Sequence, residues 1–220
     1  MPCLPKAPEW PAAQRLLKAL LLACALLLAG ALPVLAQGNG GGNGFSDMRF
    51  DASTDGVRMS GNMRFTLSDA VRDTLNRGVA VYFVFETQTT RDRWYWSDKE
   101  VFSNKRYIRL MFQPLTRRWR LNTSSEPFNR GTVGVMLNQH FNSLDEALAV
   151  VQRISSWQVL ESDEWEQDAA YNVRVRFKLD VSQLRQPLQI GTVGQSGWNL
   201  ALDRSFRLMA ADVGKASASN

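Results

Sequence analysis

Cysteine and histidine are almost missing from this sequence. The 220 residues include two cysteines, Cys3 and Cys24, and one histidine, His140. Beyond residue 36 the chain therefore has no thiol that could form a disulfide, attack a substrate or bind a metal. His140 has no second histidine or cysteine with which to build a typical zinc site, and no G-x-S-x-G sequence indicates a serine hydrolase. We expect His140, which precedes Phe141 and Ser143, to be a loop or helix-capping residue.

Loops typical of phosphate or calcium sites are also missing. The sequence Gly-Thr-Val-Gly occurs at residues 131–134 and 191–194, but neither copy precedes a capped helix with a lysine, so we expect turns or strand bends. The acidic stretch at residues 161–168 lacks the spacing and central glycine of a calcium loop, and we expect it to be solvated. No spacing singles out a pair of carboxylates for glycoside hydrolysis. The sequence thus predicts no catalytic residue, no metal ligand and no cofactor.

The N-terminus carries the longest apolar run. Residues 19–32 follow three cations, and small residues precede a cleavage position after Ala36. These features are typical of a secretory signal peptide, which we place at residues 1–36. The alternative is a retained inner-membrane anchor through residues 16–35, because roughly 20 apolar residues span a bilayer. Lys18 and Pro33 argue against that anchor.

The rest of the chain is long enough for one domain. Residues 37–44, QGNGGGNG, have five glycines and no apolar side chain, which predicts a flexible tether. Residues 45–210 predict a single β-rich domain without disulfides, and residues 211–220 a frayed tail. The net charge is +5 for the whole chain and falls to +3 without Lys6, Glu9, Arg15 and Lys18. Such a mild excess makes nucleic acid a poor candidate partner.

Alternation of apolar and polar residues predicts strands along most of this domain. The clearest case is residues 171–181, where every second residue is apolar. Residues 78–85 are apolar on both sides of the alternation, which predicts a central strand covered on both faces. Similar patterns occupy residues 45–50, 57–67, 107–112, 119–121, 132–137, 157–160 and 200–209.

Two short helices are predicted between these strands. Ser68 is a candidate N-cap for a helix that carries Ala70, Val71 and Leu75 and ends at Gly78. Ser143 and Glu146 predict a capping box, followed by an apolar stripe at residues 144, 147, 148, 151 and 154. Asp55-Gly56 predicts a hairpin turn. The fold class is therefore mostly β (α+β), an antiparallel sandwich-like domain with two short helices.

Two surfaces are candidates for binding a partner. Cations alternate with apolar residues on several predicted strands, so a shared basic face would contain Arg109, Arg118, Arg120, Arg174, Arg176 and Lys178. Such a face attracts anionic partners, although alternating cations also simply keep strands soluble. The second candidate is an aromatic cluster formed by Arg93, Trp94, Tyr95 and Trp96. Its rings would form an exposed platform or complete the edge of the core.

Several segments resemble one exported bacterial family. They are GVAVYFVFETQTTRDRWYW at residues 78–96, LTRRWRL at 115–121, SLDEALAVVQRISSWQVL at 143–160 and YNVRVRFKLDVSQLRQPLQI at 171–190. These residues are similar to the proteobacterial domain of unknown function 4390, which is also labelled a proline-rich signal-peptide protein. The resemblance implies no assigned activity and no catalytic residues. It implies an association with a two-component sensor kinase, whose gene often lies beside those of the family.

These observations together favour an exported, non-enzymatic binding or adaptor domain of the cell envelope, located in the periplasm. We expect its partner to be an envelope protein, the sensor kinase among them, or an anionic lipid or glycan surface. Two alternatives from other classes stay open. One is an envelope hydrolase without a recognisable motif, and the other is a structural protein tethered to the membrane.

Overall fold

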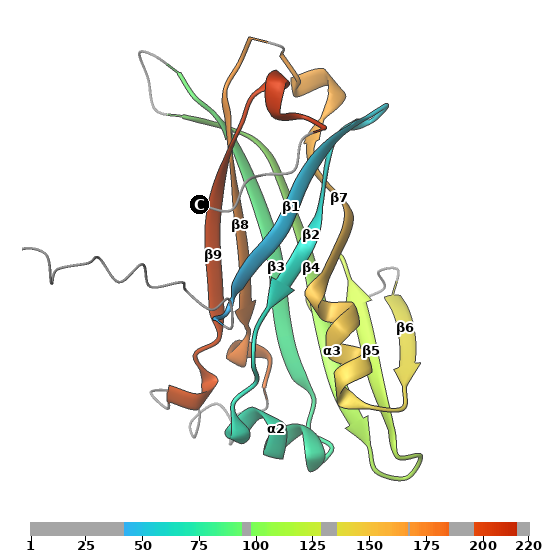
Figure 1. The fold of residues 1–220 in the computed structure, drawn as a ribbon. Helices are drawn as coiled ribbons and strands as arrows, with labels where there is room; N and C mark the ends of the chain where they lie inside the picture. The colour runs from blue at the N-terminus through green and yellow to red at the C-terminus, as the bar shows by residue number, and fades with distance from the viewer. Residues whose placement is uncertain (1–41, 94–97, 129–135, 167, 185–195, 215–220) are drawn as a thin grey trace, which may run out of the picture. The chain divides into compact units, whose positions relative to one another are not determined.

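The computed structural model describes residues 42–93, 98–128, 136–166, 168–184 and 196–214 (Figure 1). The predicted signal peptide and most of the predicted tether lie outside these residues, as do both Gly-Thr-Val-Gly copies. In the described part of the chain, no helix combines the length and apolarity needed to cross a membrane. The strands are β1 (Gly44–Ser53), β2 (Gly56–Arg64), β3 (Val81–Arg91), β4 (Lys99–Gln113), β5 (Arg118–Ser124), β6 (Met136–Phe141), β7 (Arg153–Glu161), β8 (Tyr171–Leu179) and β9 (Ala201–Leu208).

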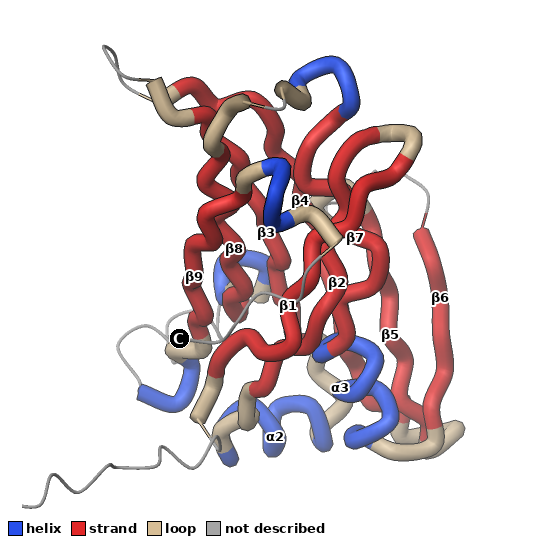
Figure 2. Tube along the Cα trace, turned by 45° about the horizontal axis from the view of Figure 1, so that its top comes forward, coloured by secondary structure: helices blue, strands red, loops and turns tan. Residues whose placement is uncertain are grey.

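These strands form two antiparallel sheets. One has three strands in the order β1-β2-β7, and the other has six in the order β6-β5-β4-β3-β8-β9. Figure 2 shows β1, β2 and β7 lying across one face of the six-stranded sheet. The buried apolar residues of both sheets form one hydrophobic core between them. The mostly β, sandwich-like fold predicted from the alternation is confirmed.

The central position of the strand that begins near Gly78 is also confirmed. β3 pairs with β4 on one side and with β8 on the other. Its inward residues Val81, Phe83 and Phe85 are buried in the core. On its other face Val84 is buried and Tyr82 half-buried, so that face is covered in part. The strand begins at Val81 and not at Gly78, because Gly78 closes the preceding helix with a φ of 79°.

Both predicted helices are present. Ser68 caps α2 (Asp69–Asn76) by accepting a hydrogen bond from the backbone N–H of Val71. Ser143 caps α3 (Leu144–Gln152) by accepting from the N–H of Glu146 over 3.1 Å. The predicted stripe was wrong at its end, because Ile154 belongs to β7 and not to the helix. The β-branched and aromatic residues Ile154, Trp157 and Val159 favour the extended conformation.

Several further boundaries differ from the predictions. β8 ends at Leu179, and Val181 begins the 3-10 helix η2 (Val181–Gln183), because the carboxylate of Asp180 accepts from the backbone N–H of Ser182. His140 lies within β6, so the expected loop or capping position was wrong. Of the predicted strand at residues 132–137, residues 132–135 lie outside the described chain.

At the C-terminus, the N–H of Gly214 donates to the carbonyl of Phe50 over 2.6 Å, so the domain extends past residue 210 through η4 (Ala210–Asp212).

Candidate functional site

All six cations of the predicted basic face lie on the same side of the six-stranded sheet. We call this side, which faces away from β1, β2 and β7, the outer face. On β3 it presents Tyr82, Val84, Glu86 and Gln88, because the alternate residues are buried in the core. The register places Arg174, Arg176 and Lys178 of β8 opposite Gln88, Glu86 and Val84. Arg109 of β4 lies opposite Tyr82, and the outward residues of β5 include Arg118 and Arg120.

Two of these cations are neutralised within the sheet. Arg174 donates from Nε to both carboxylate oxygens of Asp203 on β9, at 3.0 and 3.1 Å, and from Nη2 to Oδ2 at 2.5 Å. The hydrogen bond from Arg174 lowers the pKa of the Asp203 carboxyl, and the positive charges of Arg174 and Arg176 act in the same direction. Arg176 forms an ion pair of 3.2 Å with Glu86, and Lys105 forms one of 3.1 Å with the same oxygen.

The other four cations have no carboxylate partner among the described residues: Arg109, Arg118, Arg120 and Lys178. Arg118 donates to the side-chain oxygen of Asn142 over 3.4 Å, and Arg120 to that of Asn138 over 3.2 Å. Arg109 contacts the sulfur of Met111 at 3.9 Å. The Nε atoms of Arg109 and Arg120 are buried without a hydrogen-bond partner in the described structure. The excess positive charge therefore lies on β4, β5 and the end of β8.

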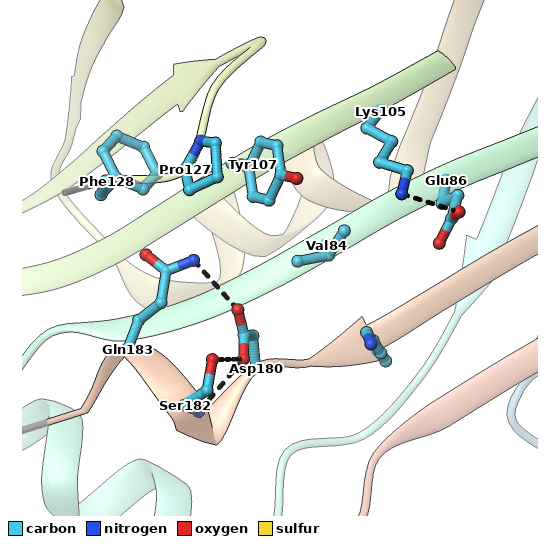
Figure 3. Close-up of a pocket in the computed structure, with 10 residues that line it drawn as sticks. Val84, Glu86, Lys105, Tyr107, Pro127, Phe128, Asp180, Ser182 and Gln183 are labelled. Carbon is cyan, nitrogen blue, oxygen red and sulfur yellow. Dashed lines mark hydrogen bonds and ion pairs between the residues drawn. The ribbon is translucent and has the colours of Figure 1, made fainter. Parts of the chain in front are cut away.

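A pocket of about 570 Å³ lies on the outer face beside Glu86 (Figure 3). Lys105 and Tyr107 of β4 line one side of it, Val84 its middle, and Asp180 with Ser182 and Gln183 the other side. Lys178 also lines this pocket. The ammonium, phenol and amide groups of this lining can form hydrogen bonds with a small polar group.

Two short segments give the pocket its walls. Pro127 and Phe128 follow β5 across the outer face, and the Phe128 ring lies 6.0 Å from that of Tyr82. On the opposite side Asp180 accepts hydrogen bonds from the Ser182 hydroxyl at 2.6 Å and from Nε2 of Gln183 at 2.9 Å. These bonds fix the Asp180 carboxylate within its own turn. Because Lys105 pairs with Glu86, Lys178 is the cation of this lining that has no carboxylate partner among the described residues.

A second hollow of about 370 Å³ adjoins the first along η2. Gln183 lines both, and Arg109, Met111 and Tyr82 line the second. The Oε1 atom of Gln183 is buried without a partner in the described structure. Arg109 thus supplies a half-buried guanidinium at one end of the pair of hollows, and Lys178 an ammonium at the other. The arrangement can bind carboxylate, sulfate or phosphate groups.

The remaining candidates from the sequence are the aromatic cluster and the acidic stretch. Trp94, Tyr95 and Trp96 lie outside the described residues, and Arg93 is exposed just before them. In the acidic stretch the side chains of Glu161, Asp163, Glu166 and Asp168 are exposed to solvent, as expected. Glu166 also pairs with Arg91, and Glu164 with Lys99. Within the described ranges, no group of three or more His, Cys, Asp or Glu side chains is placed to hold a metal ion.

Sequence reasoning missed Glu86, Tyr107, Asp180 and Asp203. Glu86 alone carried a signal, because it is the one charged residue between Gly78 and Arg91. A carboxylate directly after the apolar run at residues 79–85 predicts a cationic partner. The partner itself comes from neighbouring strands, which sequence spacing does not identify.

Comparison with known proteins agrees with the resemblance noted in the sequence. Neither the curated proteins nor the solved structures include a significant match to the chain. The family model described as a domain of unknown function (DUF4390) matches residues 44–207, from the first residue of β1 nearly to the end of β9. The match covers most of the chain and every strand described above, so the chain belongs to the DUF4390 family.

Proposed function

We propose that this protein is an exported, non-enzymatic binding or adaptor domain of the cell envelope, and that it contacts an anionic partner through the outer face. The observation that carries the proposal is the group of four cations without a carboxylate partner among the described residues: Arg109, Arg118, Arg120 and Lys178. Lys178 lines one of two adjoining hollows on this sheet face and Arg109 lines the other, while Arg118 and Arg120 lie on the neighbouring strand β5. An anion bound there would pair with guanidinium and ammonium groups that have no carboxylate partner in the described part of the chain.

Export to the periplasm belongs to the same proposal. It is supported by the cations, apolar run and small residues of positions 1–36. The partner is an envelope protein that presents an acidic patch. The alternative is an anionic lipid or glycan, which would supply the same negative charge. The sensor kinase is a candidate partner because its gene often lies beside those of the family. This is an association between genes and not a mechanism.

In-cell photo-crosslinking tests the proposal directly. A photoreactive residue would replace Arg118, which is exposed on the outer face, and in a second strain Arg49, which is exposed on β1 of the other sheet. We expect a specific adduct from position 118, identified by mass spectrometry, and none of that identity from position 49. The adduct should be lost when Lys178→Glu and Arg109→Gln are introduced together.

The controls separate loss of contact from loss of fold. Lys178 is exposed, so Lys178→Glu alone should weaken the adduct without lowering the thermal midpoint. Arg77→Glu, an exposed cation at the end of α2, serves as the matched charge reversal and should leave the adduct unchanged. An adduct from position 118 that persists in the Lys178→Glu, Arg109→Gln protein would contradict the proposal.

A further inference from the structure

A groove of about 730 Å³ lies on the opposite, inward face of the six-stranded sheet. It occurs where the three-stranded sheet ends at β7 and leaves β5 and β6 to be covered by α3 (Figure 1). Its floor comes from Ile108 of β4, Leu121 of β5 and Leu137 of β6, and its wall from Val150 of α3. The groove and the outer-face pockets therefore lie on opposite sides of the same sheet.

The charges in this groove are of one sign. Its lining includes Arg106 and Arg153 and no carboxylate. The guanidinium carbon of Arg106 lies 4.5 Å from the centroid of the Trp157 ring, and no hydrogen bond or ion pair is formed by its side chain within the described structure. Burial lowers the pKa of Arg106, which reflects the loss of water around the cation. A partly desolvated guanidinium without a carboxylate partner in the described structure binds a carboxylate strongly, because it can donate two parallel hydrogen bonds to it.

The apolar surface open to a ligand is small. Leu137 is 58% exposed and Val150 40%, whereas Ile108 and Leu121 are already covered, at 3% and 1%. Exposed apolar area of this extent suits one or two side chains and not the length of an acyl chain. Between the apolar residues lie Thr123, Gln139 and Asn62, whose polar groups an alkyl chain would leave unsatisfied and a peptide backbone would bond.

We propose that this groove binds an extended peptide segment of a partner protein, one that carries a carboxylate close to one or two apolar side chains. The carboxylate pairs with Arg106, and Arg153 adds long-range attraction at the rim. The apolar side chains pack against Leu137 and Val150, and the backbone bonds to Thr123 and Gln139. The volume of about 730 Å³ is within the range of about 300–1,000 Å³ that is typical of ligand sites.

Fluorescence polarisation with designed peptides tests the groove. The probes are fluorescein-labelled peptides of Ser and Gly that hold one Asp and one Leu at each spacing from adjacent to four residues apart, with a matched set in which Lys replaces Asp. The purified full chain should bind members of the Asp set more tightly than their Lys counterparts. Arg106→Gln should weaken that binding about tenfold or more, the loss expected for a charged hydrogen-bonded pair.

Two variants distinguish a loss of peptide binding at the groove from a loss of folding and from an effect at the outer face. Leu137→Ser, at a largely exposed position, should weaken binding while the thermal midpoint stays unchanged. Arg118→Gln, on the other face of β5, should leave the peptide affinity within about twofold. Equal binding of Asp and Lys peptides, no binding of either set, or affinity unchanged by Arg106→Gln would overturn the proposal. Binding of sodium dodecanoate through Arg106 without peptide binding would overturn it in favour of an amphiphile.

Discussion

Trp157 of β7 donates its indole N–H to the hydroxyl oxygen of Thr87 on β3 over 2.8 Å. Thr87 is fully buried and Trp157 is 7% exposed, so this bond joins the two sheets inside the core. The ring of Trp157 also meets Phe85 edge-on, with centroids 5.2 Å apart. The contact fixes β7 over the central strand of the opposite sheet.

Thr87→Val should therefore destabilise the domain by about 1–3 kcal/mol, because it leaves the buried indole N–H without an acceptor. Urea denaturation followed by tryptophan fluorescence measures the change. Thr90→Val is the matched control, since Thr90 lies three residues along β3 with no hydrogen bond from its hydroxyl in the described structure. Equal midpoints for the two variants would show that the inter-sheet bond contributes no stability.

Asp203→Asn should lower stability at neutral pH but not in acid. The hydrogen bond from Arg174 lowers the folded pKa of Asp203 below the unfolded value of about 3.9. Ionised Asp203 therefore stabilises the fold above that value, and the contribution is lost as pH falls through the folded pKa. The effect is small because both partners are largely exposed. The urea midpoint of Asp203→Asn should be lower than that of the wild type at pH 7, and the two midpoints should agree at about pH 2.

An exposed acid provides the control for this pH dependence. Asp163, in the 3-10 helix η1 (Ser162–Glu164), forms no ion pair in the described structure. Asp163→Asn should leave the midpoint close to wild type at both pH values. A deficit in Asp203→Asn that stays constant from neutral pH to acid would mean that the ion pair is not its cause.

Gly56→Ala should cost about 2 kcal/mol or more of stability. Gly56 has a φ of 128°, and a Cβ added there would lie 2.1 Å from the carbonyl oxygen of Leu160 on the neighbouring strand. The hairpin turn and the approach of β7 both require the missing side chain. Gly44→Ala is the control, because its Cβ would meet nothing within 4 Å. Similar thermal midpoints for the two variants would contradict this account.

Glu86→Gln should strengthen binding of an anionic partner at the outer face. Glu86 neutralises both Lys105 and Arg176, so its removal leaves two more cations without an acid beside the pocket. The yield of the position-118 adduct should rise, and the salt concentration needed to suppress it should rise too. Glu161→Gln, at an exposed acid of β7, should change neither quantity. A lower yield in Glu86→Gln would indicate that the partner needs this carboxylate.

The strands could be predicted from the sequence, but their partners could not. Residues 171–181 alternate so regularly that the inward face of β8 follows from the sequence alone. That β8 lies beside β3 does not follow, because Phe83 pairs with Leu179 across a large part of the chain. The same limit holds at the site. Period-two alternation predicts that Arg174, Arg176 and Lys178 share a side, whereas their acids are supplied by β3 and β9.

The order of strands in both sheets has a consequence for how the chain must fold. Arg58 of β2 donates to the carbonyl of Ser156 of β7, 98 residues away. In the same way, β3 pairs with β8, which comes much later in the sequence. Neither sheet can be completed while only the first half of the polypeptide is present. Closing such long loops is slow and entropically costly until the final contacts form. A chain that emerges N-terminus first, from a ribosome or a membrane pore, therefore stays without its core until β8 has followed. A cut near the middle would separate β2 from its neighbour β7 and β3 from its neighbour β8.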